Sequence, residues 1–390
     1  MTLVQYGDYF YLYILAIALI PAIILGVLEK NIKYYGAFIS ILMIIAIMGI
    51  GKLFPLFLVG EIALIKIYSI LRKKTDNKYL YYFVLFCSML PVIIFKVSSI
   101  VTIKSIGFIG LSYLNFKAIQ MIIEIYDENI KEVGILNTVY FFIFFTTLIS
   151  GPIDRSRRFE SDLEKKINRI EYINDYLGFG IKRIIRGIIY KFVIANLINT
   201  LWMSPIPEMV TFHGHAKSVI LINSLNYMYA YSLYLFFDFA GYTAFAVGTS
   251  YILGIKMPEN FSKPFLSKDM KEFWTRWHIS LSKWFGDYIY SRFVLNSMRN
   301  KRFKSRFVAS HVGQLLTMFI MGAWHGLEWY YIIYGLYQGL ALVGTDIYQR
   351  KSKFYKNHKK EKWFQYIQVI VTFHIVCFGL LLFSGYLYSK

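Results

Sequence analysis

His325 is the side chain whose type and setting most favour chemistry. It lies in residues 307–327, a run without Asp, Glu, Lys or Arg, within the local text MGAWHGLEWYY. An ionisable group in such an apolar segment is costly, and it usually faces the protein interior or a water-filled cavity. Because imidazole titrates near neutral pH, this histidine can serve as a general base. The pattern leaves two interpretations open: a catalytic base, or a buried histidine whose ring nitrogens are hydrogen-bonded.

Two further positions are candidates to assist a base at His325. His278 stands in the text RWHISLS next to Trp277 and near further aromatic residues, where a lone histidine is more often structural than catalytic. Asp238 stands in YLFFDFAGY between two apolar runs. There it would either hydrogen-bond a group of an active site or cap the following helix, and the pattern favours capping.

The sequence offers no metal or redox site of a familiar pattern. His213 and His215 have the spacing of two metal ligands, but no third histidine, cysteine or aspartate lies near them. Cys87 and Cys377 lie singly in apolar runs, where we expect small buried side chains. The signatures of nucleophile-elbow hydrolases, zincins and P-loop ATPases are absent from the sequence. We therefore expect no metal and no cofactor bound by the chain itself.

The composition indicates a membrane protein that does not bind nucleic acid. Hydrophobic residues make up 57% of the 390 residues, aromatic residues make up 19%, and the formal net charge is +20. A chain this apolar is neither disordered nor a coiled coil, and two cysteines do not make a disulfide scaffold. Basic residues between long apolar runs are typical of the cytoplasmic loops of a membrane protein.

Uncharged runs predict an all-α, polytopic membrane protein with a single domain over residues 1–390. We expect about eleven transmembrane helices plus re-entrant and interfacial helices around a central tunnel. The uncharged runs are 10–28, 34–51, 79–95, 133–153, 192–207, 218–237, 239–255, 307–327, 329–345 and 363–389. Residues 53–71 are also apolar, although they contain two charged side chains. Residues 100–125 are interrupted by lysines and glycines, which favours a re-entrant or tilted pair of short helices.

Basic clusters predict which end of each span faces the cytoplasm. The order of acidic Asp8, apolar 10–28 and then Lys30 places the N-terminus outside. Lys30 is the first basic residue, so the charged region of a cleavable signal peptide is missing. Further clusters lie at 72–74, 155–169, 299–306 and 350–362, and the last of these places the C-terminus outside. We therefore expect a multi-pass protein of the cell membrane, in contact with lipid, with both termini outside.

Residues 256–306 have a distinct composition. They are too polar to span a bilayer, yet they contain three tryptophans and many other aromatic residues. Ser267 is the expected N-cap of a helix, with Asp269 in its first turn, and aromatic and leucine side chains then recur at helical spacing. The segment therefore predicts amphipathic helices that lie in the membrane interface or dip into it, followed by a cytoplasmic basic cluster.

Two motifs carry a resemblance to a known family. A Trp-His-Gly motif in an apolar helix, preceded by Arg-Trp-His-x-Ser-Leu-Ser, resembles the membrane-bound O-acyltransferase (MBOAT) family. The text GPIDRSRRF at 151–159 and MGAWHGLEWYYIIYGLYQG at 321–339 is similar to that of family members that transfer D-alanine to teichoic acids. The resemblance covers the whole chain and is strongest from about 230 to 340. Polysaccharide O-acetylases of the same family share the Arg-Trp-His core, so acetyl transfer to a polysaccharide stays an alternative.

The resemblance implies a membrane O-acyltransferase of a Gram-positive bacterium. It would take D-alanine from a phosphopantetheine thioester on a small acidic carrier protein, DltC, in the cytoplasm. The phosphopantetheine therefore comes with the carrier. The D-alanyl group would cross the membrane for D-alanylation of lipoteichoic or teichoic acid in cell wall biogenesis, with DltD as a partner on the outer side. An alternative is a non-enzymatic conduit, with the partner protein carrying out the transfer.

The resemblance also assigns residues. His325 would be the catalytic base for attack of a hydroxyl on the thioester, and His278 would be the second characteristic histidine. A tunnel for the carrier's arm would be lined by Trp274, Trp277, Trp324, Asp238, Ser280 and Ser282. Small residues that would leave room for it are Gly241, Gly248, Gly254, Gly322 and Gly326. The carrier would dock on Phe293, Val294, Leu295, Met298, Arg299 and Arg302. The same basic charges are also typical of an ordinary cytoplasmic loop.

Overall fold

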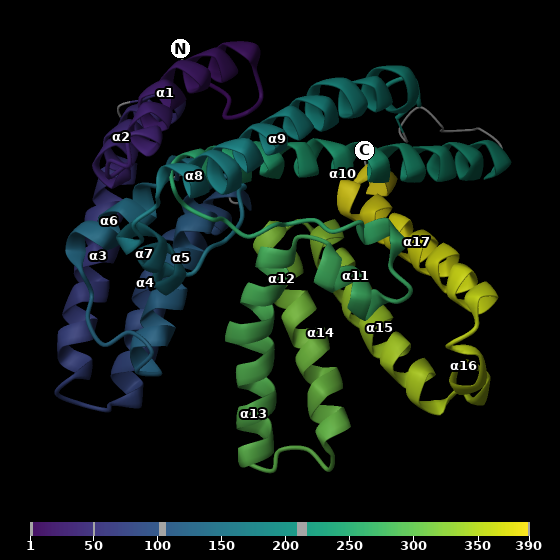
Figure 1. Ribbon diagram of the computed structural model, residues 1–390. Coiled ribbons are helices and arrows are strands. Elements are labelled where there is room, and N and C mark those ends of the chain that lie inside the picture. Colours follow the sequence, from purple (N-terminus) through teal and green to yellow (C-terminus); the bar gives the residue numbers. More distant parts are fainter. Residues whose placement is uncertain (1–2, 50, 101–106, 209–216, 389–390) are drawn as a thin grey trace. The chain divides into compact units, whose positions relative to one another are not determined.

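Figure 1 shows a computed structural model of the chain, which describes residues 3–49, 51–100, 107–208 and 217–388. These residues form helices and connecting loops without any β-strand, which confirms the predicted all-α fold. The chain divides into two compact units. Unit 1 comprises Met1–Ile188 and Gly241–Pro258, and unit 2 comprises Ile189–Ala240 and Glu259–Lys390.

Unit 1 is built mainly from the N-terminal half of the chain. Its helices are α1 (Tyr9–Val27), α2 (Lys33–Met48), α3 (Leu53–Arg72), α4 (Lys78–Ile100), α5 (Leu111–Tyr126), α6 (Ile135–Ile143), η1 (Phe145–Thr147), α7 (Ser156–Glu164), α8 (Arg169–Glu171), η2 (Tyr172–Leu177) and α9 (Gly178–Gly187). The carboxylate of Asp8 caps α1 by accepting a hydrogen bond from the backbone N–H of Tyr11 at 2.6 Å. The stretch 100–125, expected as a pair of short helices, contains one described helix, α5, while residues 101–106 lie outside the described residues. α5 is buried on nearly every face, as a core helix is.

Six helical stretches in the described part of the chain are long and apolar enough to cross a membrane. They are α1, α3, Lys78–Ser98 of α4, Arg169–Met203, α14 (Arg306–His325) and α17 (Lys362–Ser384). Large apolar side chains on them are exposed, such as Leu56 and Val59 of α3 at 70% and 67%, as a surface facing lipid requires. The protein is therefore a multi-pass membrane protein. Other predicted spans fall on shorter or more polar helices, such as α2 and α15 (Trp329–Lys351).

α10 (Lys217–Ile252) corrects one of the predicted boundaries. The sequence predicts two spans, 218–237 and 239–255, but the structure has one continuous helix of 36 residues. The helix continues because no proline interrupts it. At 1.5 Å per residue it is about 54 Å long, far more than the roughly 30 Å thickness of the hydrocarbon core.

Unit 2 contains the C-terminal helices. In chain order its elements are η3 (Ile188–Ala195), η4 (Ile198–Met203), most of α10, η6 (Pro264–Leu266), α11 (Met270–Arg276), α12 (Ile279–Phe285), η7 (Gly286–Tyr290), α13 (Ser291–Arg299), α14, α15, α16 (Lys353–His358), α17 and η8 (Tyr386–Tyr388). The segment 256–306 thus consists of short helices.

The N-cap of α11 is Asp269, which accepts from the N–H of Glu272 at 2.9 Å, so the prediction that Ser267 is the N-cap is wrong. The Ser267 hydroxyl instead closes η6 by donating to the carbonyl of Pro264 at 2.6 Å.

At several positions glycines let helices approach closely and do not leave open space. A Cβ atom on Gly322 would lie 2.5 Å from a backbone oxygen of α15, and one on Gly335 would lie 2.5 Å from a backbone oxygen of α14. The backbones of α14 and α15 therefore touch at these positions. The prediction that glycines make room for an arm is wrong at Gly248, Gly322 and Gly326, because neighbouring atoms occupy the place of a Cβ. Gly254 is needed for its left-handed backbone, with φ of 83°.

Candidate active site

His325 is the last residue of α14 and lies among aromatic rings of unit 2. Its ring centroid is 4.7 Å from that of Trp324, 5.0 Å from Phe383 and 6.3 Å from both Tyr331 and Tyr334. The half-buried imidazole thus lies where α14 ends, α15 begins and α17 ends. The C-terminal end of a helix carries a partial negative charge, which stabilises a positive charge at this position. A base that becomes an imidazolium is well placed there.

His278 lies in the turn between α11 and α12. Its backbone is left-handed, with φ of 43°, which is uncommon for a residue other than glycine. Asn260 holds the turn, because its carbonyl accepts from the N–H of Ile279 at 3.0 Å and its side-chain oxygen accepts from the Ser280 hydroxyl at 2.6 Å. Only 4% of His278 is exposed, and its ring meets that of Phe239 edge to face at 4.9 Å. Unusual backbone held in this way is concentrated at functional sites.

The two histidines, far apart in the sequence, lie close enough in unit 2 for one to affect the ionisation of the other. Burial, and to a smaller extent a positive charge on His325, lower the pKa of His278 to about 3. His278 is therefore neutral at physiological pH, and its imidazole carries one ring N–H. The structure thus brings together the two histidines that the motifs single out.

Three of the residues predicted for a tunnel support the segment that carries His278. Trp277 is buried in an aromatic cluster, with ring centroids 5.1 Å from Phe261 and 5.6 Å from Phe273. The hydroxyl of Ser282 donates to the carbonyl of Trp277 at 3.1 Å. Ser280 is bonded to the amide that holds the turn, as described above. Their contacts stabilise this segment, and a role in a tunnel stays a prediction for all three.

Trp324 and Trp274 have a different setting. Trp324 lies directly against His325. Trp274 is buried, and its indole Nε1 has no hydrogen-bond partner among the described residues. Buried polar atoms without partners are rare in native structures and call for an explanation. These two tryptophans remain candidates to meet a bound substrate.

Asp238 does not cap a helix, because α10 runs straight through its position. Its carboxylate forms an ion pair with the ammonium group of Lys191 in η3. The sequence analysis missed this partner, although Lys191 is the lone charged residue in the apolar text from 187 to 203. The ion pair joins η3 to α10, and a tunnel role for Asp238 stays a prediction.

The predicted docking surface on α13 is exposed only in part. Its exposed members are Leu295, Met298, Arg299 and Arg302. Phe293 and Val294 are half-buried instead, because they pack on Gly313 of α14. The structure therefore offers a smaller apolar surface beside the basic residues than the sequence predicts.

A charged cluster ties α11 to α14 and α15, and the sequence analysis missed it. Asp346 is 4% exposed and binds Nζ of Lys271 at 2.5 Å, Nε2 of His311 at 2.8 Å and Nε of Arg350 at 2.6 Å. Lys271 belongs to α11, which leads directly to His278. The cluster therefore helps to hold the helix in front of the candidate site. Arg350 follows Asp346 by four residues on α15, but no local spacing links Lys271 or His311 to them, and the sequence assigns His311 no role.

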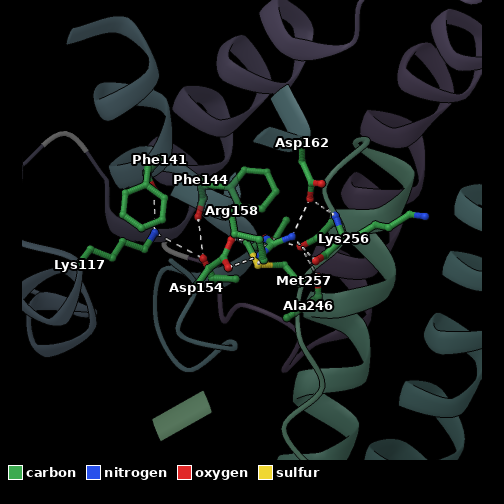
Figure 2. A network of polar contacts seen from close by, with 12 residues as sticks. Lys117, Phe141, Phe144, Asp154, Arg158, Asp162, Ala246, Lys256 and Met257 are labelled. Atoms are coloured by element: carbon green, nitrogen blue, oxygen red, sulfur yellow. Dashed lines mark hydrogen bonds and ion pairs between the residues drawn. The ribbon is translucent and has the colours of Figure 1, made fainter. Parts of the chain in front are cut away.

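A second polar network lies in unit 1 and joins the GPIDRSRRF text to the segment after α10, as Figure 2 shows. Arg158 of α7 pairs with both carboxylate oxygens of Asp154 and with Asp162, the latter at 2.6 Å. Arg158 also donates to the carbonyl of Lys256, whose own N–H donates to Asp162 at 2.8 Å. The sequence analysis treats this basic cluster as a topology marker and misses that Arg158 is held by the buried carboxylate of Asp154 and the half-buried one of Asp162.

The described residues contain no group of three or more His, Cys, Asp or Glu side chains placed to hold a metal ion. His213 and His215 lie outside the described residues. Cys377 is buried and Cys87 is half-buried, and both are free thiols.

Comparisons with known proteins point in the same direction as the motifs. The model of the membrane-bound O-acyltransferase (MBOAT) family matches residues 39–388. The chain is 41% identical to the "Teichoic acid D-alanyltransferase" of Bacillus subtilis (strain 168), over 97% of this chain and 98% of that protein. It is 39% identical to the protein of the same name from Streptococcus thermophilus, over 98% and 95%. Identity to "Probable alginate O-acetylase AlgI" of Pseudomonas syringae pv. tomato is 31%, over 71% of this chain and 49% of that protein. These matches confirm the predicted resemblance.

Proposed function

The chain belongs to the membrane-bound O-acyltransferase family, and on that premise we propose that it transfers D-alanine for the D-alanylation of teichoic acid. The donor is the D-alanyl thioester on the phosphopantetheine arm of DltC, and DltD is the partner on the outer side. The observation that carries the proposal is that His325, among aromatic rings, and His278, buried in a left-handed turn, lie near each other in unit 2. The D-alanyltransferases match nearly the whole chain, whereas the alginate O-acetylase is matched over about half its length, which favours D-alanine over acetyl.

His325 is the general base in this proposal. It takes the proton of an acceptor hydroxyl while the hydroxyl oxygen attacks the carbonyl carbon of the thioester. The tetrahedral intermediate collapses, its carbon–sulfur bond breaks, and the imidazolium returns the proton to the departing thiolate. The products are a D-alanyl ester and the free thiol of the arm. The negative end of α14 supports the positive charge that His325 carries between the two steps.

His278 assists without changing its own protonation state. Its neutral ring has one N–H, which donates to the negative oxygen of the tetrahedral intermediate. Burial favours this role, because a fixed donor in a water-poor site stabilises developing charge more than the same donor does in water. Asn260 and Ser280, which hold the turn, are positioning residues.

The acidic carrier docks at the basic end of the unit 2 helices. α14 begins at Arg306, α15 ends at Lys351 and α17 begins at Lys362, so the helix ends remote from His325 are basic. The positive-inside rule assigns these ends to the cytoplasm. Carrier contacts come from the exposed part of α13 and the loop that follows it, at Leu295, Met298, Arg299 and Arg302.

The decisive experiment measures D-alanyl ester formation on teichoic acid from D-alanyl-DltC in membranes that also contain DltD. The variant His325→Ala should lower the rate by about 10²–10⁴-fold, the usual contribution of a general base. The matched control is His374→Ala, because His374 lies on the exposed face of α17 and should leave the rate unchanged. Binding of DltC must be equal in all three proteins.

Two results would contradict the proposal in different ways. Unchanged ester formation by a stably inserted His325→Ala variant would favour the conduit, with the partner protein carrying out the transfer. Membranes that use an acetyl donor but not D-alanyl-DltC would favour the polysaccharide O-acetyltransferase.

A further inference from the structure

Gln338 of α15 is a fully buried amide without a hydrogen-bond partner. Its exposed fraction is 0%, and neither Oε1 nor Nε2 has a partner within the described residues. Gln120 of α5 is buried to the same extent, but its Nε2 donates to the carbonyl of Asp154 at 2.9 Å. Because an unpaired buried amide lowers stability, an apolar side chain of the same size would serve folding better at position 338. The contrast indicates that Gln338 is polar for a reason other than folding.

The packing of α15 on α17 places Gln338 one helical turn from the surroundings of His325. The rings of Tyr334 and Phe383 both contact His325, and their centroids are 5.1 Å apart. Gln338 follows Tyr334 by four residues on α15, and Gly379 precedes Phe383 by four residues on α17. A Cβ atom on Gly379 would lie 2.4 Å from Nε2 of Gln338, so these two residues meet just as the two rings do. One helical turn, about 5.4 Å, separates the two contacts.

The amide lies on the side of His325 that leads to the basic helix ends. From Tyr334, α15 continues past Gln338 towards Arg350 and Lys351. Long side chains of a helix lean towards its N-terminal end, so the amide of Gln338 leans back towards His325. A donor that reaches His325 from the basic end passes the level of Gln338.

We propose that Gln338 hydrogen-bonds an amide group of the phosphopantetheine arm while the thioester lies at His325. This inference rests on the proposed function and adds a residue that determines which donor is accepted. Each amide of the arm has one N–H donor and one carbonyl acceptor, which Oε1 and Nε2 of Gln338 match together. The ammonium group of D-alanine is a weaker match, because it would use Oε1 alone and leave Nε2 unpaired.

The test compares the binding of holo-DltC, which carries the arm, with that of apo-DltC, which lacks it. The variant Gln338→Met keeps the size of the side chain and removes its hydrogen bonds. It should bind holo-DltC about tenfold more weakly than the wild type, with apo-DltC binding unchanged and the melting temperature unchanged or raised. Gly379→Ala should weaken holo-DltC binding in the same way, since it displaces the amide. The matched control Gln120→Met should lower the melting temperature and keep the wild-type ratio of holo to apo affinity.

Wild-type affinity for holo-DltC in Gln338→Met would overturn the inference, whether the melting temperature is unchanged or raised. A second measurement uses the unaltered protein and compares D-alanyl pantetheine with a D-alanyl alkyl thioester of equal length. Preference for the pantetheine thioester supports the inference, and equal binding refutes it. Both measurements concern binding, so failure of the chemistry proposed for His325 would be seen separately, as unchanged ester formation by His325→Ala.

Discussion

Two buried regions, one in each unit, treat their polar groups in opposite ways. In unit 1, the guanidinium of Arg158 is surrounded by the carboxylates of Asp154 and Asp162 and by a backbone carbonyl. In unit 2, His325 is surrounded by aromatic rings, and the amide of Gln338 nearby has no partner among the described residues. A fully paired network stabilises a fold, whereas a buried polar group without a partner is available to a ligand. The comparison therefore separates structural charge from groups that can take part in chemistry.

Breaking the paired network of unit 1 should have the largest effect on stability. Arg158→Met leaves the buried carboxylate of Asp154 without its cation, so the free energy of unfolding should fall by about 3–5 kcal/mol. Thermal unfolding of the purified protein measures this loss. Lys73→Met is the matched control, because the ion pair of Lys73 with Glu132 is exposed and should contribute at most about 1 kcal/mol. Equal melting temperatures for the two variants would mean that the network of Arg158 is not a structural anchor.

A change in helix packing beside His325 should have the next largest effect. Gly322→Ala forces the backbones of α14 and α15 apart, which should cost about 1–3 kcal/mol of stability and lower D-alanyl transfer. Gly344→Ala on α15 is the matched control, because a Cβ there meets nothing within 4 Å. Alanine at that position should stabilise the helix by up to about 1 kcal/mol. If both variants melt at the same temperature, the close contact of α14 with α15 is not required.

The burial of His278 should give the smallest effect, a loss of stability in mild acid. Burial lowers the pKa of His278 to about 3 in the folded protein, against about 6.5 in the unfolded chain. Between these values the unfolded chain binds more protons, so stability falls as the pH falls. From pH 7 to pH 5.5 the loss should be about 1 kcal/mol.

Melting temperatures across this pH range check the sign and the size of the effect. His278→Asn should flatten the dependence on pH, whereas His374→Asn, at an exposed position, should keep it. A steeper fall in His278→Asn than in the wild type would contradict the assignment.

Local features of the chain were predictable where a short stretch of sequence contains all the information. The uncharged run 307–327 predicted α14 and drew attention to His325, and the polar text 256–306 predicted amphipathic helices, which the structure has as several short ones. The prediction of Ser267 as a helix cap failed because two capping residues stand close together, and Ser267 closes the preceding turn. The prediction of two spans around Asp238 failed because a charge does not end a helix when a partner, Lys191, meets it in space.

The sequence by itself determined the all-α class, the membrane character, the family and the two histidines, because these depend on composition and on motifs a few residues long. Only the tertiary structure decided which distant groups meet. Asn260 holds the turn of His278, Asp346 gathers hydrogen-bond partners from three helices, and Gln338 has no partner among the described residues. The physical reason is that hydrogen bonds and ion pairs act over a few ångströms, so helix packing determines which of them form.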